Sequence, residues 1–371
     1  MSITTEIKVP YTNFPQLIAQ VRPELHEAFD AVITSGRYIL GPHLAQFEKE
    51  VSEFIGVGHA LGFSNGTAAL HVALQQMKIG AGDEVITAPN SFLASASSVA
   101  LAGAEPRFAD VGDDMNMDPA ALEAAITPRT RAIIPVHLTG RPARMPEIMA
   151  IARKHNLLVL EDCAQAIGAR RDGRMVGTWG EASAFSLHPL KNLFTFGDSG
   201  LLVTNDPELH RRLWMARSHG MSTRDVCDFW SDNNRMDELH AAFLLVHLKK
   251  LKQWTEERRS LALRYNDALR GLVKVPDEGA GEYHVYQTYM IRTDRRDQLQ
   301  DFLRGKGIEA LTHYRIPIHM QPAARSLGYK PDDFPAAKKL SETILSLPLY
   351  PGLTEEKQEY VQSSIRDFFR A

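Results

Sequence analysis

Leu157-Leu-Val-Leu160, which Glu161 and Asp162 follow, is the stretch of the sequence that decides the fold. Its residues are apolar without alternation, as in a strand that is buried on both faces of a parallel sheet. Strands of this kind alternate with helices along the chain, which predicts an α/β fold with a mostly parallel sheet. The other segments that we interpret as strands are 84–88 and 131–137, and the helical ones are 92–102 and 145–156.

The carboxyl end of this strand is a candidate ligand site. Ligands of open α/β sheets bind beyond the carboxyl ends of the strands, and Asp162 lies at such an end. An aspartate there could bind Mg²⁺, cap the next helix, hold a ribose hydroxyl or pair with a protonated ring nitrogen. A dinucleotide site is poorly supported, because no GxGxxG follows a strand near the N-terminus, and no GxxxxGK[ST] motif is present. These residues alone leave the alternatives for Asp162 open.

A loop with Lys191 near its centre connects two more apolar runs, 182–187 and 201–204. Desolvation lowers the pKa of an amine and makes it a better nucleophile, as in lysines that form Schiff bases. Solvated surface lysines are far more common, so only partners elsewhere in the chain can assign a reactive role to Lys191. The apolar residues that flank it are Leu190, Leu193, Phe194 and Phe196.

A turn of small residues at Ser64-Asn-Gly-Thr67 precedes a helical pattern that ends at Gly80. Asn65-Gly66 is a turn signal, and Thr67 can cap the helix. The N–H groups at such a helix start can bind a phosphate, although an ordinary capped helix would have the same sequence.

The rest of the chain is predicted to form three units. Residues 1–30 read as an N-terminal arm that packs on another part, and residues 31–250 as a large domain. Residues 251–371 read as a smaller α+β domain with short strands at 285–292. A long helix at 236–264 would link the two domains.

Composition excludes several classes of function. The chain of 371 residues is 44% hydrophobic and 23% charged, as expected of a globular protein, and its net charge of −3 disfavours a nucleic-acid partner. We expect no membrane association and a cytoplasmic location, because no apolar run approaches 18 residues and the start lacks a signal-peptide pattern. Two cysteines and no HxxxH pattern predict no metal site.

Ordered motifs along nearly the whole chain resemble those of the DegT/DnrJ/EryC1/StrS family of pyridoxal-phosphate (PLP) aminotransferases, which act on nucleotide-linked keto sugars. The resemblance implies the aspartate-aminotransferase fold (PLP fold type I). Its large, mostly parallel-sheet domain is sandwiched by helices and joined to a smaller α+β C-terminal domain. It also implies a homodimer whose active sites use both subunits. The motifs include Tyr38-Ile-Leu-Gly-Pro42, Ser64-Asn-Gly-Thr67, Glu161-Asp-Cys-Ala-Gln-Ala166, Phe185-Ser-Leu-His-Pro-Leu-Lys-Asn-Leu193 and Asn233-Asn-Arg-Met-Asp237.

The resemblance also implies roles for single residues. Lys191 would form the Schiff base with PLP, and Asp162 would pair with the pyridine nitrogen; these two are the predicted catalytic residues. Gln165 would lie near the ring hydroxyl, and Phe92 would stack on the ring. The implied phosphate ligands are Gly66, Thr67, Ser186 and, from the neighbouring subunit, Asn233. The candidate substrate contacts are Tyr38, His188, His313, Tyr314 and His319, although His188 could equally be structural.

The chain also departs from the family pattern. Leu187, Leu190 and Ser199 stand where the family often has other residues, and Ser231-Asp232 precede Asn233 where glycine and an aromatic residue are frequent. These departures concern the substrate pocket and the loop geometry, because Lys191 and Asp162 are retained.

The expected reaction moves an amino group from an amino acid, with glutamate as the expected donor, to a keto sugar through pyridoxamine phosphate (PMP). Lys191 would carry the proton in both halves of the reaction. A PLP- or PMP-dependent sugar dehydratase is one alternative, although those relatives have a histidine in place of this lysine. An aminocyclitol aminotransferase and a non-catalytic regulatory protein of the same fold are the others.

Overall fold

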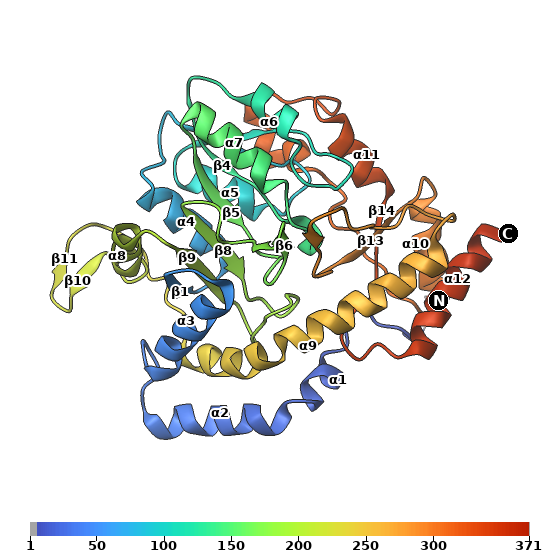
Figure 1. Cartoon of the computed structure of the whole chain (residues 1–371), viewed down its shortest axis with the longest axis horizontal. Coiled ribbons are helices and arrows are strands. Elements are labelled where there is room, and N and C mark those ends of the chain that lie inside the picture. The colour runs from blue at the N-terminus through green and yellow to red at the C-terminus, as the bar shows by residue number, and fades with distance from the viewer. Residues whose placement is uncertain (1–5, 371) are drawn as a thin grey trace.

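Within residues 6–370, which the computed structural model describes, a seven-stranded sheet forms the centre of the fold (Figure 1). β9 runs antiparallel to both of its neighbours, and all other neighbouring pairs are parallel. The predicted mostly parallel α/β sheet is therefore confirmed. In spatial order the strands are β1 (His59–Phe63), β9 (Gly200–Thr204), β8 (Ala182–Ser186), β5 (Leu158–Asp162), β4 (Thr130–Ile134), β2 (Glu84–Thr87) and β3 (Glu105–Phe108).

Helices cover both faces of the sheet because side chains alternate along each buried strand. Val85 and Leu160 belong to the core on one face, whereas the adjacent Ile86 and Val159 belong to the core on the other. The first face packs against α4 (Gly66–Gln76), α5 (Ala94–Leu101) and α8 (Pro207–Ala216). The second packs against α3 (Pro42–Ile55), α6 (Pro119–Ala125), α7 (Met145–His155) and the start of α9 (Glu238–Leu269).

The smaller domain is built on the far half of α9, as Figure 1 shows. α9 confirms the predicted linking helix and extends five residues beyond its expected end at 264. Only Tyr289–Arg292 of the predicted strand region forms a strand, so the strand prediction for 285–288 is wrong. The other elements here are α10 (Arg296–Gly305), α11 (Pro335–Thr343), β14 (Ile344–Leu347), which pairs with β13 (Tyr289–Arg292), and α12 (Glu355–Arg370).

The N-terminal segment packs against both parts of the molecule. Val9 pairs with Ile308 in the smaller domain. α1 (Phe14–Ala19) and α2 (Arg22–Ser35) follow, and Leu17, Val21 and Leu25 pack against Phe194 and Trp254. α2 runs across the boundary at residue 30 that we expected between the arm and the large domain.

The remaining elements are short. They are β6 (Arg170–Arg171), β7 (Arg174–Met175), β12 (Glu282–Tyr283), the hairpin of β10 (Met221–Thr223) and β11 (Val226–Cys227), and the 3₁₀ turns Leu138–Gly140, Ile318–Met320 and Pro322–Leu327.

None of the helices in residues 6–370 combines the length and the apolar character that crossing a membrane requires.

Candidate functional site

A cavity of about 550 Å³ lies at the carboxyl ends of β5 and β8 and at the start of α4. Ligands of open α/β sheets bind at this edge, so its position agrees with the fold. Most of the site residues that the sequence predicts line this one cavity: Gly66, Thr67, Phe92, Asp162, Gln165, Ser186, His188, Lys191, His313 and Tyr314.

Lys191 lies in the loop that connects the antiparallel strands β8 and β9. Leu187 N donates to Ser199 O at 2.8 Å and so closes the base of the loop, and Thr195 N donates to Leu187 O at 3.0 Å. Burial lowers the pKa of the Lys191 amine, and the nearby carboxylate of Asp162 partly opposes this shift. A larger fraction of Lys191 is therefore in the neutral, nucleophilic form than in an exposed lysine.

The apolar residues that flank Lys191 divide into two groups. Leu193 and Phe194 are buried and fix the loop, whereas Leu190 and Phe196 are 40% and 46% exposed. Of these four residues, Leu190 lines the cavity together with Lys191.

Asp162 is the last residue of β5 and is buried in the cavity wall. Its Oδ1 accepts from Ala164 N at 3.1 Å, in a turn that no helix follows, so the helix-cap alternative is wrong. Burial raises the pKa of its carboxyl group, against the opposing effects of Ala164 N–H, Lys191 and His137. A cationic N–H placed at this carboxylate would compensate its lost hydration.

Gln165 and Phe92 both lie next to Tyr314. The amide oxygen of Gln165 accepts from Thr139 N at 2.5 Å, and its Nε2 donates to the Tyr314 hydroxyl at 3.3 Å. The Phe92 ring is 52% exposed and lies 5.6 Å from the Tyr314 ring, centroid to centroid. An apolar face of this kind at a cavity wall is suited to a flat aromatic ligand.

The start of α4 forms the anionic end of the cavity. Asn65, and not Thr67 as predicted, is the N-cap: its side chain accepts from Ala68 N at 2.8 Å, and its carbonyl from Ala69 N. This leaves the N–H groups of Gly66 and Thr67 at the cavity wall, where the positive end of the helix dipole favours a phosphate. A Cβ atom at Gly66 would lie 3.1 Å from the Ser186 Cβ, so glycine allows this close approach.

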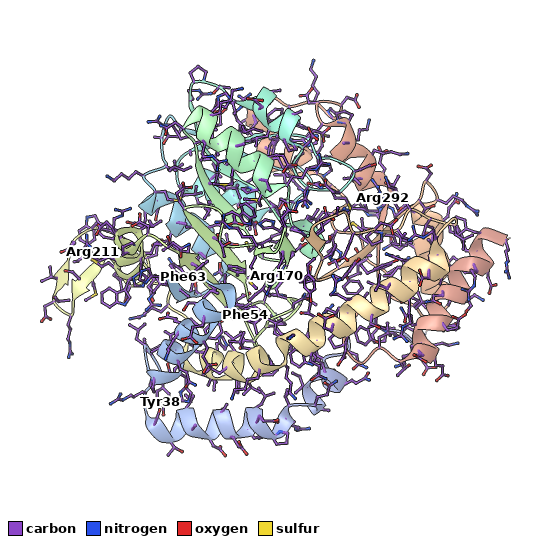
Figure 2. The ribbon with its side chains drawn as sticks, viewed as in Figure 1. Tyr38, Phe54, Phe63, Arg170, Arg211 and Arg292 are labelled. Atoms are coloured by element: carbon purple, nitrogen blue, oxygen red, sulfur yellow. The ribbon has the colours of Figure 1, made fainter. Side chains whose placement is uncertain are left out.

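Three predicted site residues lie outside the cavity of their own chain. Tyr38 is 54% exposed at the edge of the molecule between α2 and α3 (Figure 2). His319 is buried in the core 4.8 Å from the Phe334 ring, so the fold gives no support to its role as a substrate contact. Asn233 is exposed and forms an isolated β-bridge with Ser218.

The cavity also contains residues that the sequence did not point to. Tyr11 comes from the N-terminal segment, and its ring lies 5.7 Å from that of His313. Gln287 and Thr288 come from the wrongly predicted strand region. Tyr11, Thr288 and His313 come together only because three distant segments of the chain pack against one another. The sequence around Tyr11 contains no motif that predicts a site residue.

A buried cluster of His137, Glu161 and Cys163 has the composition of a metal site. The Glu161 carboxylate, however, accepts from the N–H groups of Gly177, Trp179 and Gly180, from the Ser183 hydroxyl, and pairs with His137 at 3.1 Å. Burial would raise its pKa, but these contacts lower it overall. Glu161 and His137 thus belong to a hydrogen-bond network that occupies both side chains and holds the end of β5 beside Asp162.

Comparison with known proteins identifies close relatives of the chain. A model of the DegT/DnrJ/EryC1/StrS aminotransferase family matches residues 19–366. A protein named pleiotropic regulatory protein from Geobacillus stearothermophilus is 43% identical, covering 98% of this chain and 99% of its own length. UDP-N-acetyl-3-dehydro-alpha-D-glucosamine 3-aminotransferase from Acidithiobacillus ferrooxidans is 40% identical, with 98% and 99% coverage.

A solved structure resembles the whole fold. It is that of DesV from S. venezuelae in complex with a ketimine intermediate. It superposes with a TM-score of 0.96 at 38% identity, covering 99% of this chain and all of its own.

Proposed function

Because this chain belongs to the DegT/DnrJ/EryC1/StrS aminotransferase family, we propose that it uses PLP to move an amino group from an amino acid to a keto sugar, and that this sugar is nucleotide-linked. The observation that supports the proposal most is the single cavity that contains a desolvated lysine, a buried carboxylate and an open helix start. Relatives named for UDP-linked and dTDP-linked amino sugars support the nucleotide-linked substrate.

The residues of the cavity fit PLP. Gly66, Thr67 and Ser186 would hold the phosphate, and Phe92 would cover the face of the ring. Asp162 would hold the proton on the ring nitrogen, because a desolvated carboxylate is stabilised by such a partner. When bound, PLP supplies an electron sink for the electron pair of the carbon that loses its proton.

Lys191 performs two tasks in this proposal. Its amine, neutral more often because of burial, attaches the cofactor covalently. Once an amino-acid donor, which we propose to be glutamate, has displaced it, the same amine would take the proton from the donor α-carbon and deliver it to the cofactor carbon that had carried the Schiff base. In the second half, Lys191 would move the proton in the reverse direction, so that the amino group ends on the former keto carbon of the sugar.

The proposal includes a homodimer. From the family resemblance, Asn233 would complete the phosphate site of a partner subunit, and its exposed position outside the cavity of its own chain supports this assignment. Trp230, three residues earlier, is 94% exposed, and exposed aromatic side chains of this size are typical of interfaces.

Purified protein provides the direct test. It should carry a visible absorbance band from PLP bound to Lys191, and glutamate should bleach this band as the amino group is transferred. A protein that never takes up PLP would contradict the proposal. It would favour the regulatory alternative, which the name of the 43% identical relative from Geobacillus stearothermophilus raises.

One wall of the cavity, formed by Tyr11, Thr288, His313 and Tyr314, suits a sugar better than a carboxylate. Burial, and then the nearby Lys191, lower the pKa of His313 to about 4, so it is neutral near pH 7. Burial raises the pKa of the Tyr11 and Tyr314 phenols, which therefore stay protonated. Neutral donors and acceptors match the hydroxyl groups of a sugar.

We therefore expect Tyr11→Phe to affect mainly the second half of the reaction. Loss of one neutral hydrogen bond of about 1 kcal/mol should slow the transfer from the PMP form to a UDP-linked or dTDP-linked 3-keto sugar about fivefold. The reaction of the PLP form with glutamate should change by less than about twofold. Single-turnover spectroscopy of each half measures both rates, and equal slowing of the two would show that Tyr11 only supports the fold.

A further inference from the structure

The side-chain amide of Gln165 has a fixed orientation in the cavity wall. Its oxygen accepts the short hydrogen bond from Thr139 N, at 2.5 Å. The NH₂ group must therefore point the other way, toward the Tyr314 hydroxyl and the cavity. The part of the Gln165 amide that faces the cavity is therefore its NH₂ group, a hydrogen-bond donor.

This orientation depends on the turn Leu138–Gly140. Thr139 has a φ of +62°, a left-handed conformation that is uncommon for a residue branched at Cβ. Gly140 follows with a φ of +91°, and a Cβ atom there would lie 2.7 Å from Val285 Cγ2 and 2.9 Å from Gln165 O. The turn is thus packed tightly between Gln165 and the segment that leads to the smaller domain.

His284 holds the side chain of Thr139 from that segment. Burial, with the nearby charges of Arg141 and Arg259, keeps the pKa of His284 well below its usual range, so the ring is neutral. Its Nδ1 accepts from Tyr286 N at 2.7 Å, which leaves the proton on Nε2. Nε2 then donates to Thr139 Oγ1 at 3.2 Å, and this hydroxyl donates to Leu138 O at 2.6 Å.

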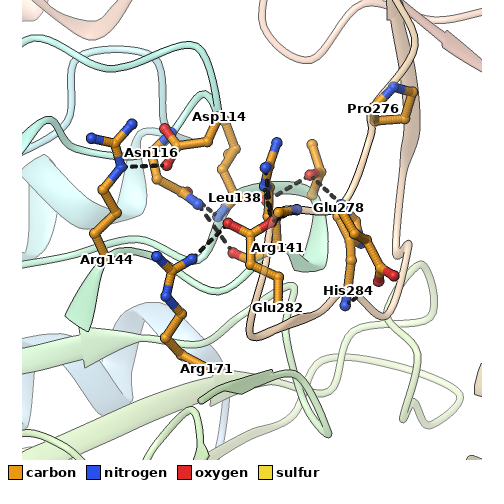
Figure 3. Close-up of polar contacts among 12 residues, drawn as sticks. Asp114, Asn116, Leu138, Arg141, Arg144, Arg171, Pro276, Glu278, Glu282 and His284 are labelled. Atoms are coloured by element: carbon orange, nitrogen blue, oxygen red, sulfur yellow. Dashed lines mark hydrogen bonds and ion pairs between the residues drawn. The ribbon is translucent and has the colours of Figure 1, made fainter. Parts of the chain in front are cut away.

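The segment that carries His284 is anchored at several points (Figure 3). His284 N donates to Glu278 Oε1 at 2.7 Å. Glu282 binds both Arg141, at 2.8 Å, and Arg171, at 2.6 Å. On the opposite side of the turn, Asn116 accepts from Leu138 N at 3.0 Å and donates to Arg141 O at 3.2 Å. Residues of both domains therefore fix the position of Thr139.

From this geometry we propose that Thr139 and His284 are positioning residues that hold Gln165 as a hydrogen-bond donor to the ring oxygen of bound PLP. The inference rests on the proposed function, because it assigns a partner to the cofactor ring. In this proposal, the contact between the turn Leu138–Gly140 and the smaller domain supports the cofactor site, although neither Thr139 nor His284 lines the cavity.

The test is a pH titration of the visible band of PLP bound to Lys191, which needs no substrate. A donor at the ring oxygen stabilises its negative charge and so lowers the pKa at which the band changes. Thr139→Val removes the hydroxyl at nearly constant volume and should raise this pKa by roughly half a unit to one unit. Thr139→Ser keeps the hydroxyl and should give the wild-type value. His284→Phe keeps a ring but no donor and should shift the pKa in the same direction as Thr139→Val.

A double-mutant cycle shows whether Thr139 acts through Gln165. Gln165→Leu alone should give the largest shift, and adding Thr139→Val to it should change the pKa no further. Additive shifts, or a Thr139→Val protein with the wild-type pKa and an unchanged melting temperature, would overturn the inference. If the wild-type protein shows no visible band with PLP, the proposed function itself has failed, and the two failures are thus distinguishable.

Discussion

Replacement of Lys191 with alanine should lower transaminase activity by at least about 10³-fold, because the protein loses both the covalent attachment of PLP and its acid–base group. The cavity that surrounds the amine would remain, so the variant should still bind PLP without a covalent bond. Borohydride should fix PLP to the wild-type chain and not to the variant, and mass spectrometry of the reduced proteins measures this difference. Lys49→Ala, at an exposed position on α3, serves as the control and should behave like the wild type.

The same variant can also test the shared site. In a mixture of Lys191→Ala and Asn233→Ala subunits, one cavity of each mixed dimer would contain Lys191 from one chain and Asn233 from the other. Activity above that of either variant alone is the expected result. A mixture no more active than its components would contradict the assignment of Asn233 to the partner's site.

Asp162→Asn should have the second largest effect, a fall in kcat of about 10²- to 10³-fold, because an amide cannot keep a ring nitrogen protonated as a carboxylate does. Steady-state kinetics at saturating PLP measures this fall and separates it from weaker cofactor binding. Near-wild-type kcat for the asparagine variant would show that the carboxylate is not the partner of the ring.

In the protein without cofactor, Asp162→Asn should not lower the thermal stability, although it lowers kcat. The pKa of the Asp162 carboxyl group is raised in the folded state, so the folded protein favours its protonated form. The stability that this group contributes is therefore fully present at a pH below its pKa in the unfolded chain. It is lost as the pH rises through its pKa in the folded protein. Asp162→Asn removes this loss, so its melting temperature at pH 7 should equal or exceed that of the wild type. The difference should shrink at pH 4, and calorimetry at both pH values checks it. A melting temperature that falls at pH 7 would show that the carboxylate is structural.

The sequence predicted the sheet and the lysine loop because both are encoded locally. Continuous apolar runs such as Leu157–Leu160 can be buried only between helices, and Asp162 follows such a run directly. The wrong assignments concern residues whose structure is decided by contacts with segments that are distant in the sequence or by competition between neighbouring caps. Asn65 takes the cap in place of Thr67, and segment 285–288 bonds to the turn at Thr139 in place of a strand partner.

The full set of cavity residues could not be predicted for a related reason. Tyr11 and His313 are far apart in the chain, and their rings meet only because the N-terminal segment pairs with the smaller domain beside Val9. His319 has the residue type of a substrate contact, yet it is buried with Phe334. Residue type alone does not tell which side chains of a loop face the core and which face a ligand.

The antiparallel pairing of β8 and β9 has a consequence for how such a site can change over evolutionary time. Both ends of the lysine loop return to the same edge of the sheet, and the bond from Leu187 N to Ser199 O closes it there. The nucleophile is thus held by the base of the loop, while Leu190 and Phe196 extend outward with large exposed areas. Leu190 also lines the cavity beside Lys191. Substitutions at Leu190 should therefore change which molecule the cavity accepts while the base of the loop keeps the reactive amine in place.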